Sequence, residues 1–147
     1  MTTTMVDKNS LDELFEQIVE MANAQFESEQ YKRLFGMRFT KERTQAYVIQ
    51  RTHWTVNRRD CWALTQGVAP FEVKKIIWDH EREELEGKPD IGMEDHYQLS
   101  VREGAALGLT PEDFVTTPPC DGLVACGLAW QHLASHSHWL TSLASCS

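Results

Sequence analysis

The sequence predicts an all-α protein, and three observations support that prediction. Apolar residues recur at the three- and four-residue spacing of amphipathic helices along most of the 147-residue chain. No segment shows the strict apolar and polar alternation of a half-buried strand. Residues that start or stop helices, such as Thr40, Pro70 and Gly87, fall between the periodic segments. We therefore expect antiparallel helices packed as one bundle domain over residues 1–147.

Two long helices are expected first. Ser10 begins the sequence S-L-D-E, a capping box in which the Ser10 hydroxyl accepts from the backbone of Glu13 while the Glu13 side chain reaches back. The helix that follows is expected to run to about residue 28. Thr40 is expected to cap a second helix from Lys41 to about Gln66, whose length is typical of a bundle.

Shorter helices are expected in the rest of the chain. One covers residues 71–86, because Pro70 suits a helix start and Gly87 a helix end. The sequence G-K-P-D-I-G that follows is a loop. Further helices are expected over about 93–107, from T-P-E-D at 110–113, over about 123–134 and from 137 onward. The last segment stays apolar and helix-forming to Ser147, so we expect the sequence to stop in mid-helix, at a frayed natural terminus, in a truncated reading frame or at the end of an excised fragment.

Composition narrows the classes of function. The formal net charge of -8 and the pI near 5.2 argue against a nucleic-acid partner, which needs a basic face. No apolar run is long enough to span a bilayer, and the first residues lack a secretory signal, so a cytoplasmic protein without a membrane partner is expected. No C-x-x-C motif links the four cysteines, which are expected to be small core residues: Cys61, Cys120, Cys126 and Cys146.

The acidic helix over residues 71–86 holds the first candidate site. On a helix that turns about 100° per residue, His80 and Glu84 share one stripe with the apolar Ile77. A carboxylate on an apolar face must be paired, hydrogen-bonded or bound to a metal. His96 has a similar inward phase on the next helix, and a glutamate and a histidine from neighbouring helices are typical of iron or manganese sites in bundles. The alternative is a His80–Glu84 pair at the surface beside the core.

A second histidine pair lies near the end of the sequence. His132 and His136 are one helical turn apart, a spacing at which two imidazoles can share a metal ion. No nearby Cys, Asp or Glu completes a ligand set of four, so a polar helix junction is the favoured interpretation.

Four segments of the sequence carry a resemblance to a known superfamily: HEREEL at 80–85, HYQL at 96–99, ALGLTPED at 106–113 and WLTSLA at 139–144. From about Leu34 onward, the sequence resembles the superfamily of thiaminase II and pyrroloquinoline-quinone synthase. The resemblance implies a heme-oxygenase-like helical bundle. The same superfamily includes oxidases with two iron ions, metal-free oxidases and hydrolases.

For the di-iron oxidases, the resemblance implies Glu84 and His96 as metal ligands, with Glu81, Glu86 and His80 as alternatives. It implies two iron ions, dioxygen as co-substrate, and a small metabolite that bears an amine or a carboxylate. The family pattern then requires a further Glu just beyond WLTSLA and a His–Asp–His set on a later helix. Because the sequence contains neither, it resembles the N-terminal two-thirds of such an enzyme with its last helices missing, and activity of this chain alone is not expected.

The sequence also allows other interpretations of the function. Tyr47, Gln50 and Trp54 fall on one side of the second long helix and are candidates for the lining of a substrate pocket, although such a stripe is also typical of a core. A metal-free oxidase or a thiaminase-like hydrolase is one alternative, with Cys61 or Cys146 as a loosely indicated nucleophile. A non-catalytic partner-binding module is another, and we expect self-association or a homo-oligomer through an exposed apolar groove.

Overall fold

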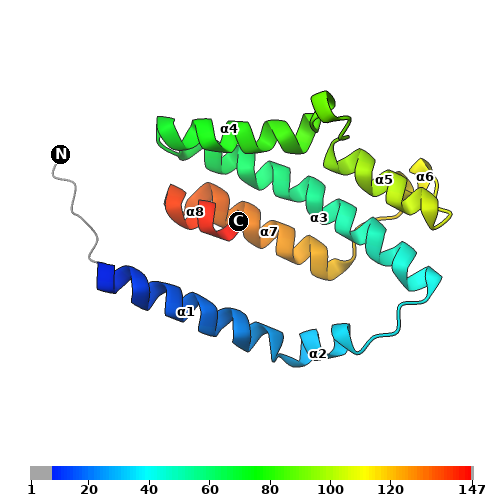
Figure 1. The fold of residues 1–147 in the computed structure, drawn as a ribbon, viewed down its shortest axis with the longest axis horizontal. Coiled ribbons are helices and arrows are strands. Elements are labelled where there is room, and N and C mark those ends of the chain that lie inside the picture. The colour runs from blue at the N-terminus through cyan, green and yellow to red at the C-terminus, as the bar shows by residue number, and fades with distance from the viewer. Residues whose placement is uncertain (1–7, 147) are drawn as a thin grey trace. The chain divides into compact units, whose positions relative to one another are not determined.

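The structure of the chain is a computed structural model that describes residues 8–146. The described residues form helices and no strand, which confirms the all-α prediction (Figure 1). In order, the elements are α1 (Lys8–Phe26), α2 (Glu29–Phe35), α3 (Lys41–Val68), α4 (Phe71–Glu86), the 3-10 helix η1 (Pro89–Ile91), α5 (His96–Ala106), α6 (Pro111–Thr116), α7 (Asp121–His136) and α8 (Trp139–Cys146). None of the described helices has the length and apolar composition that a bilayer crossing requires.

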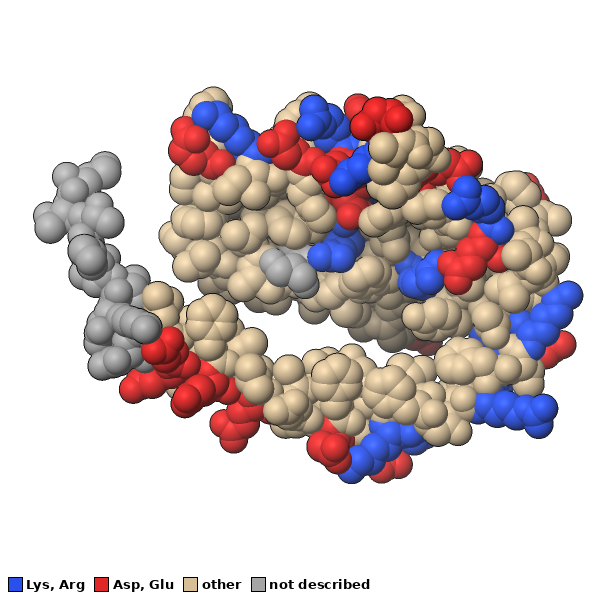
Figure 2. All heavy atoms as spheres, viewed as in Figure 1, with Lys and Arg blue, Asp and Glu red and all other residues tan. Residues whose placement is uncertain are grey.

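The described residues divide into two compact units at Phe39, and the single domain expected from the sequence stays a prediction. The first unit holds α1 and α2, and Figure 2 shows the acidic side chains of α1 gathered along one side of that helix. An aromatic cluster joins the two helices, because the ring of Tyr31 lies 5.3 Å from that of Phe26 and 5.7 Å from that of Phe35, measured between centroids. Such ring pairs add directional contacts to the burial of apolar surface.

Two details of the first unit differ from the prediction. Helix α1 begins at Lys8, so Ser10 lies within its first turn instead of capping it. Helix α2 was not predicted at all. Its cap is Ser28, whose hydroxyl accepts a hydrogen bond from the backbone of Tyr31, and α2 begins just beyond the residue near which the first helix was expected to end.

In the second unit, α3 is the central helix. It contacts α4, α5, α6, α7 and α8, and Figure 1 shows α4 and α7 on opposite sides of it. Two groups of buried apolar side chains surround α3. One consists of Cys61, Trp62, Ala69, Ile77 and Ala134, and the other of Val48, Ile49 and Phe114. The long helix therefore presents different faces to different neighbours along its length.

Most helix ends in this unit follow the predicted signals. Thr40 caps α3 by accepting from Arg43, and Thr110 forms a capping box with Asp113 at the start of α6. Helix α5 begins at residue 96 and not near 93, because the Asp95 carboxylate accepts from the backbone of Gln98 and fixes the helix start there.

The cysteines are not all core residues. Cys61 is fully buried, as predicted. Cys120 and Cys126 are exposed, which corrects the prediction for both. Cys120 occupies the cap position of α7, and Cys126 lies on the outer face of that helix. The Cys146 side chain is outside the described residues.

The turn after α4 depends on a glycine. Gly87 has a φ of 70° and a ψ of -154°, a region in which residues with a Cβ are strained. A Cβ at this position would collide with the carbonyl oxygen of Met93, on the far side of the loop that η1 occupies. Gly87 therefore lets the chain turn back sharply from α4 towards α5.

We expect Gly87→Ala to lower the free energy of unfolding by about 2 to 3 kcal/mol, from backbone strain plus the collision with Met93. Gly92→Ala is a matched control, since Gly92 has nearly the same φ of 71° but no neighbour that its Cβ would meet. Its expected cost is about 1 kcal/mol. Urea denaturation measures both, and equal costs would contradict the account of this turn.

Candidate functional site

A group of charged and imidazole side chains lies where α3, α4 and α5 meet. We call it the Arg59 cluster, and it consists of Arg59, His80, Glu81, Glu84 and His96. Arg59 comes from the middle of α3, and the next three come from the last two turns of α4. His96 is the first residue of α5, where the Gly87 turn and the Asp95 cap place it beside α4.

The Glu84 carboxylate is the centre of the cluster. Its Oε2 atom lies 2.5 Å from His96 Nδ1 and 2.6 Å from Arg59 Nη1. The same guanidinium nitrogen lies 3.2 Å from Glu81 Oε1. The side chains of Arg59, Glu81 and Glu84 are only 12, 11 and 14% exposed. Charges buried to this extent are stable only when they are paired, and Arg59 of α3 forms ion pairs with both carboxylates of α4.

His80 completes the cluster on its outer side. Its Nε2 atom lies 3.7 Å from Glu81 Oε1 and 4.0 Å from Glu84 Oε1, and its ring packs 5.2 Å from that of Trp62. Neither His80 Nε2 nor Glu81 Oε1 forms a directed hydrogen bond within the described residues, although both atoms are buried. Buried polar atoms without hydrogen bonds are uncommon and are typical of functional sites.

Burial also affects protonation in the cluster. The pKa of Glu81 is raised, mainly because burial disfavours its charged form and also because Glu84 repels it, while Arg59 and Arg58 partly offset both effects. A carboxylate with a raised pKa next to a specific charge partner is a feature of catalytic and binding sites, and of some structural ion pairs as well.

The structure brings together the two residues that the sequence named first. Glu84 and His96 are in direct contact, although their role as metal ligands stays a prediction. His80 lies beside them, and Glu81, one of the alternative ligands that the resemblance implies, is the most buried glutamate of α4. Glu86 is exposed at the end of α4 and belongs to no ion pair of the cluster.

Sequence reasoning missed Arg59. The sequence feature that could have indicated Arg59 is the pair Arg58 and Arg59. This pair lies in the middle of a long helix, only a few residues before the buried Trp62. Arginine is the basic residue best suited to buried ion pairs, because its planar fork binds carboxylates with several donors.

The predicted pocket residues lie elsewhere on α3. Tyr47 is 48% exposed, and Gln50 binds the loop before α7 by donating to the carbonyl of Pro118 (3.1 Å) and accepting from the backbone of Cys120 (2.7 Å). Trp54 packs edge to face against Trp130 of α7, with 5.7 Å between ring centroids. Gln50 and Trp54 therefore hold α3 to its neighbours. None of the three lines either of the two cavities described next, and their role in a substrate pocket stays a prediction.

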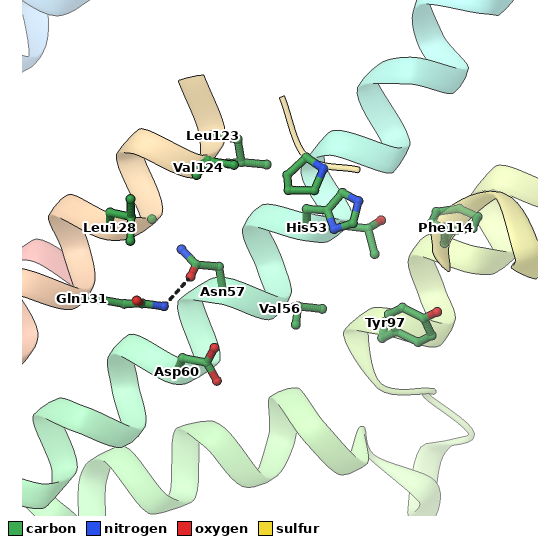
Figure 3. A pocket seen from close by; sticks show the side chains of 13 residues that line it. His53, Val56, Asn57, Asp60, Tyr97, Phe114, Leu123, Val124, Leu128 and Gln131 are labelled. Atoms are coloured by element: carbon green, nitrogen blue, oxygen red, sulfur yellow. Dashed lines mark hydrogen bonds between the residues drawn. The ribbon is translucent and has the colours of Figure 1, made fainter. Parts of the chain in front are cut away.

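Two cavities flank α3. One of about 570 Å³ lies between α3, α4 and α8; it is mostly apolar and includes the His80 ring of the Arg59 cluster. The other, of about 480 Å³, lies between α3, α5, α6 and α7 and has a more polar lining (Figure 3). Both have the size of small-molecule sites, which span roughly 300 to 1,000 Å³.

The Arg59 cluster fits part of an iron site. Carboxylate oxygen and imidazole nitrogen are ligands that iron accepts, and the buried His80 Nε2 and Glu81 Oε1 lack hydrogen bonds. However, the described residues contain no group of three or more His, Cys, Asp or Glu side chains arranged to hold a metal ion. Arg59 supplies the positive charge instead. The residues therefore fit two ligands, Glu84 and His96, and not a complete two-iron centre.

The second histidine pair is a surface feature. The rings of His132 and His136 stack with centroids 4.5 Å apart, and both residues are exposed or half-exposed. His136 Nδ1 is already engaged with Ser135 Oγ (2.8 Å) and the carbonyl of His132 (3.1 Å). This arrangement agrees with the polar helix junction favoured from the sequence.

Comparison with known proteins adds no family to this description. No protein-family model, curated protein or solved structure matches the chain.

Proposed function

We propose that the Arg59 cluster belongs to the iron site of a non-heme oxidase with a heme-oxygenase-like helical arrangement. The observation that supports this proposal is the contact between Glu84 and His96, which lie on different helices and meet at 2.5 Å beside a second carboxylate. An oxygen and a nitrogen ligand from neighbouring helices are the way in which bundle proteins begin such a site. The family resemblance names the same two residues.

Each residue of the cluster then has a task. Glu84 and His96 would hold the metal ion, and binding would require a neutral His96 ring, because only an unprotonated ring nitrogen can be a ligand. Arg59 lies behind Glu84 and orients its carboxylate, as outer partners of metal ligands do. Bound iron supplies the redox chemistry with dioxygen, and the resemblance implies two ions, further ligands and a small amine- or carboxylate-bearing substrate.

The ion pairs of Arg59 support a second candidate function, that of a metal-free enzyme of the same superfamily. Its guanidinium already neutralises Glu81 and Glu84, so the cluster is stable without a metal ion. In that case His80 lines the apolar cavity and is the group of the cluster that a substrate there would meet. Glu81, whose pKa is raised, lies behind it, with its Oε1 atom 3.7 Å from His80 Nε2. Iron binding separates the two candidates.

The test is an anaerobic titration of the protein with ferrous ion in which calorimetry measures the binding. We expect weak, saturable binding, because two ligands give less chelation than a full set. His96→Ala and Glu84→Gln are each expected to weaken it at least about tenfold. His132→Ala is the control, because it removes an imidazole outside the cluster. If the wild-type chain binds no iron, or if both cluster variants bind as it does, the metal-free candidate replaces the oxidase.

A further inference from the structure

The cavity between α3 and α7 has a lining that the proposed iron site does not use. We call it the α3–α7 cavity. Its polar residues are His53, Asn57 and Asp60 on one face of α3, Tyr97 on α5 and Gln131 on α7. Its walls are apolar and include Val56, Phe114, Leu123, Val124 and Leu128. Apolar walls with a few convergent polar groups are typical of sites for small molecules.

The polar groups on the α7 side are held in place. Gly127 lets α7 approach α3 closely, because a Cβ there would lie 2.6 Å from Asn57 Nδ2. Gln131 Nε2 donates to Asn57 Oδ1 at 3.1 Å, which fixes both amides (Figure 3). Across the cavity, His53 Nε2 lies 2.7 Å from the carbonyl oxygen of Thr117 and must be the donor, since a carbonyl only accepts.

The groups that remain for a ligand include a donor as well as acceptors. Asn57 Nδ2 can donate, Gln131 keeps its carbonyl oxygen as an acceptor, and His53 keeps one ring nitrogen that can only accept while the ring is neutral. The Asp60 carboxylate forms no ion pair with any residue that the structure describes. Figure 3 shows Asp60 and the Asn57–Gln131 pair at one end of the cavity and Tyr97 with Phe114 at the other. A ligand must therefore bring donors and a positive charge to the Asp60 end.

We propose that the α3–α7 cavity binds a primary amine with an apolar body. The ammonium group carries three donors and one charge, which match the acceptors and the carboxylate at the Asp60 end. The body lies against the apolar side chains of α6 and α7. The proposal does not depend on iron, because the cavity and the Arg59 cluster share no residue.

Three probes of similar size and different charge test this proposal: 2-phenylethylamine, 2-phenylethanol and 3-phenylpropionate. Each is titrated into ¹⁵N-labelled protein with a metal chelator present, and the Gly127 amide and the side-chain amides of Asn57 and Gln131 are followed by NMR. We expect saturable shifts with the amine and binding about fivefold weaker for the alcohol, the ratio that one exposed ion pair provides. The carboxylate is expected to bind most weakly.

Asp60→Asn separates charge from shape. The variant is expected to reduce amine affinity about fivefold, to that of the alcohol, while alcohol affinity stays unchanged and shows that the cavity is intact. Glu42→Gln, on the same helix and outside the cavity, is expected to change neither affinity. Equal wild-type affinities for amine and alcohol, preference for the carboxylate, no binding of any probe, or an Asp60→Asn variant with full amine affinity would each overturn the proposal.

Discussion

Arg59→Met is expected to lower the free energy of unfolding by about 3 to 5 kcal/mol, because it leaves the carboxylates of Glu81 and Glu84 buried without a cation. Methionine keeps much of the length and apolar stem of arginine, so the loss measures charge and not volume. Arg102→Met is the matched control. Arg102 pairs with Glu94 at the surface, and its loss is expected to cost less than about 1 kcal/mol.

Urea denaturation of both variants measures these losses. Replacing Glu81 and Glu84 by glutamine in the Arg59→Met background is expected to recover part of the stability, since no carboxylate then remains unpaired. A loss at Arg59 no larger than that at Arg102, or a triple variant less stable than Arg59→Met alone, would mean that the cluster is not the buried ion network described here.

Ile77→Ala is expected to cost about 2 to 5 kcal/mol, because it opens a cavity in a packed core. Ile77 is 1% exposed and packs with Cys61, Trp62 and Ala134. Ile76→Ala makes the same chemical change one position away, where the side chain is 70% exposed, and its expected effect is within about 0.5 kcal/mol. The urea concentrations at which the two variants are half unfolded give the comparison. Similar losses of stability would contradict the assignment of Ile77 to the buried face of α4 and Ile76 to the exposed face.

The helices of the second unit could be predicted because their signals are local. Thr40, Gly87 and the Thr110–Asp113 box act within one turn of the chain, and each ends or begins a helix where expected. Helix α2 was missed because it is only seven residues long, which is too short to show a helical period, and the Ser28 cap is a weak signal by itself. The division at Phe39 depends on contacts between distant residues, which periodicity does not report.

The candidate site shows the same limit. Helical phase predicts inner faces for Glu84 and His96. The structure brings the two into contact, but the His96 side chain is 46% exposed, so His96 lies at the edge of the cluster and not on an inner face. Phase does not tell which helix a face meets, and it therefore does not predict that Arg59 of α3 lies opposite Glu81 and Glu84. In the same way, phase places Tyr47 and Trp54 on one side of α3 but does not predict that Trp54 packs against α7.

The most direct test of the iron site identifies its nitrogen ligand. The chain is loaded with ferrous ion, treated with nitric oxide to give an EPR signal, and studied by pulsed EPR with ¹⁴N or ¹⁵N histidine. The account predicts a histidine nitrogen coupling in the wild-type protein that disappears in His96→Ala and persists in His80→Ala and His132→Ala. A coupling that survives in His96→Ala, or that is never seen in the wild type, would contradict the assignment of Glu84 and His96 as the metal ligands.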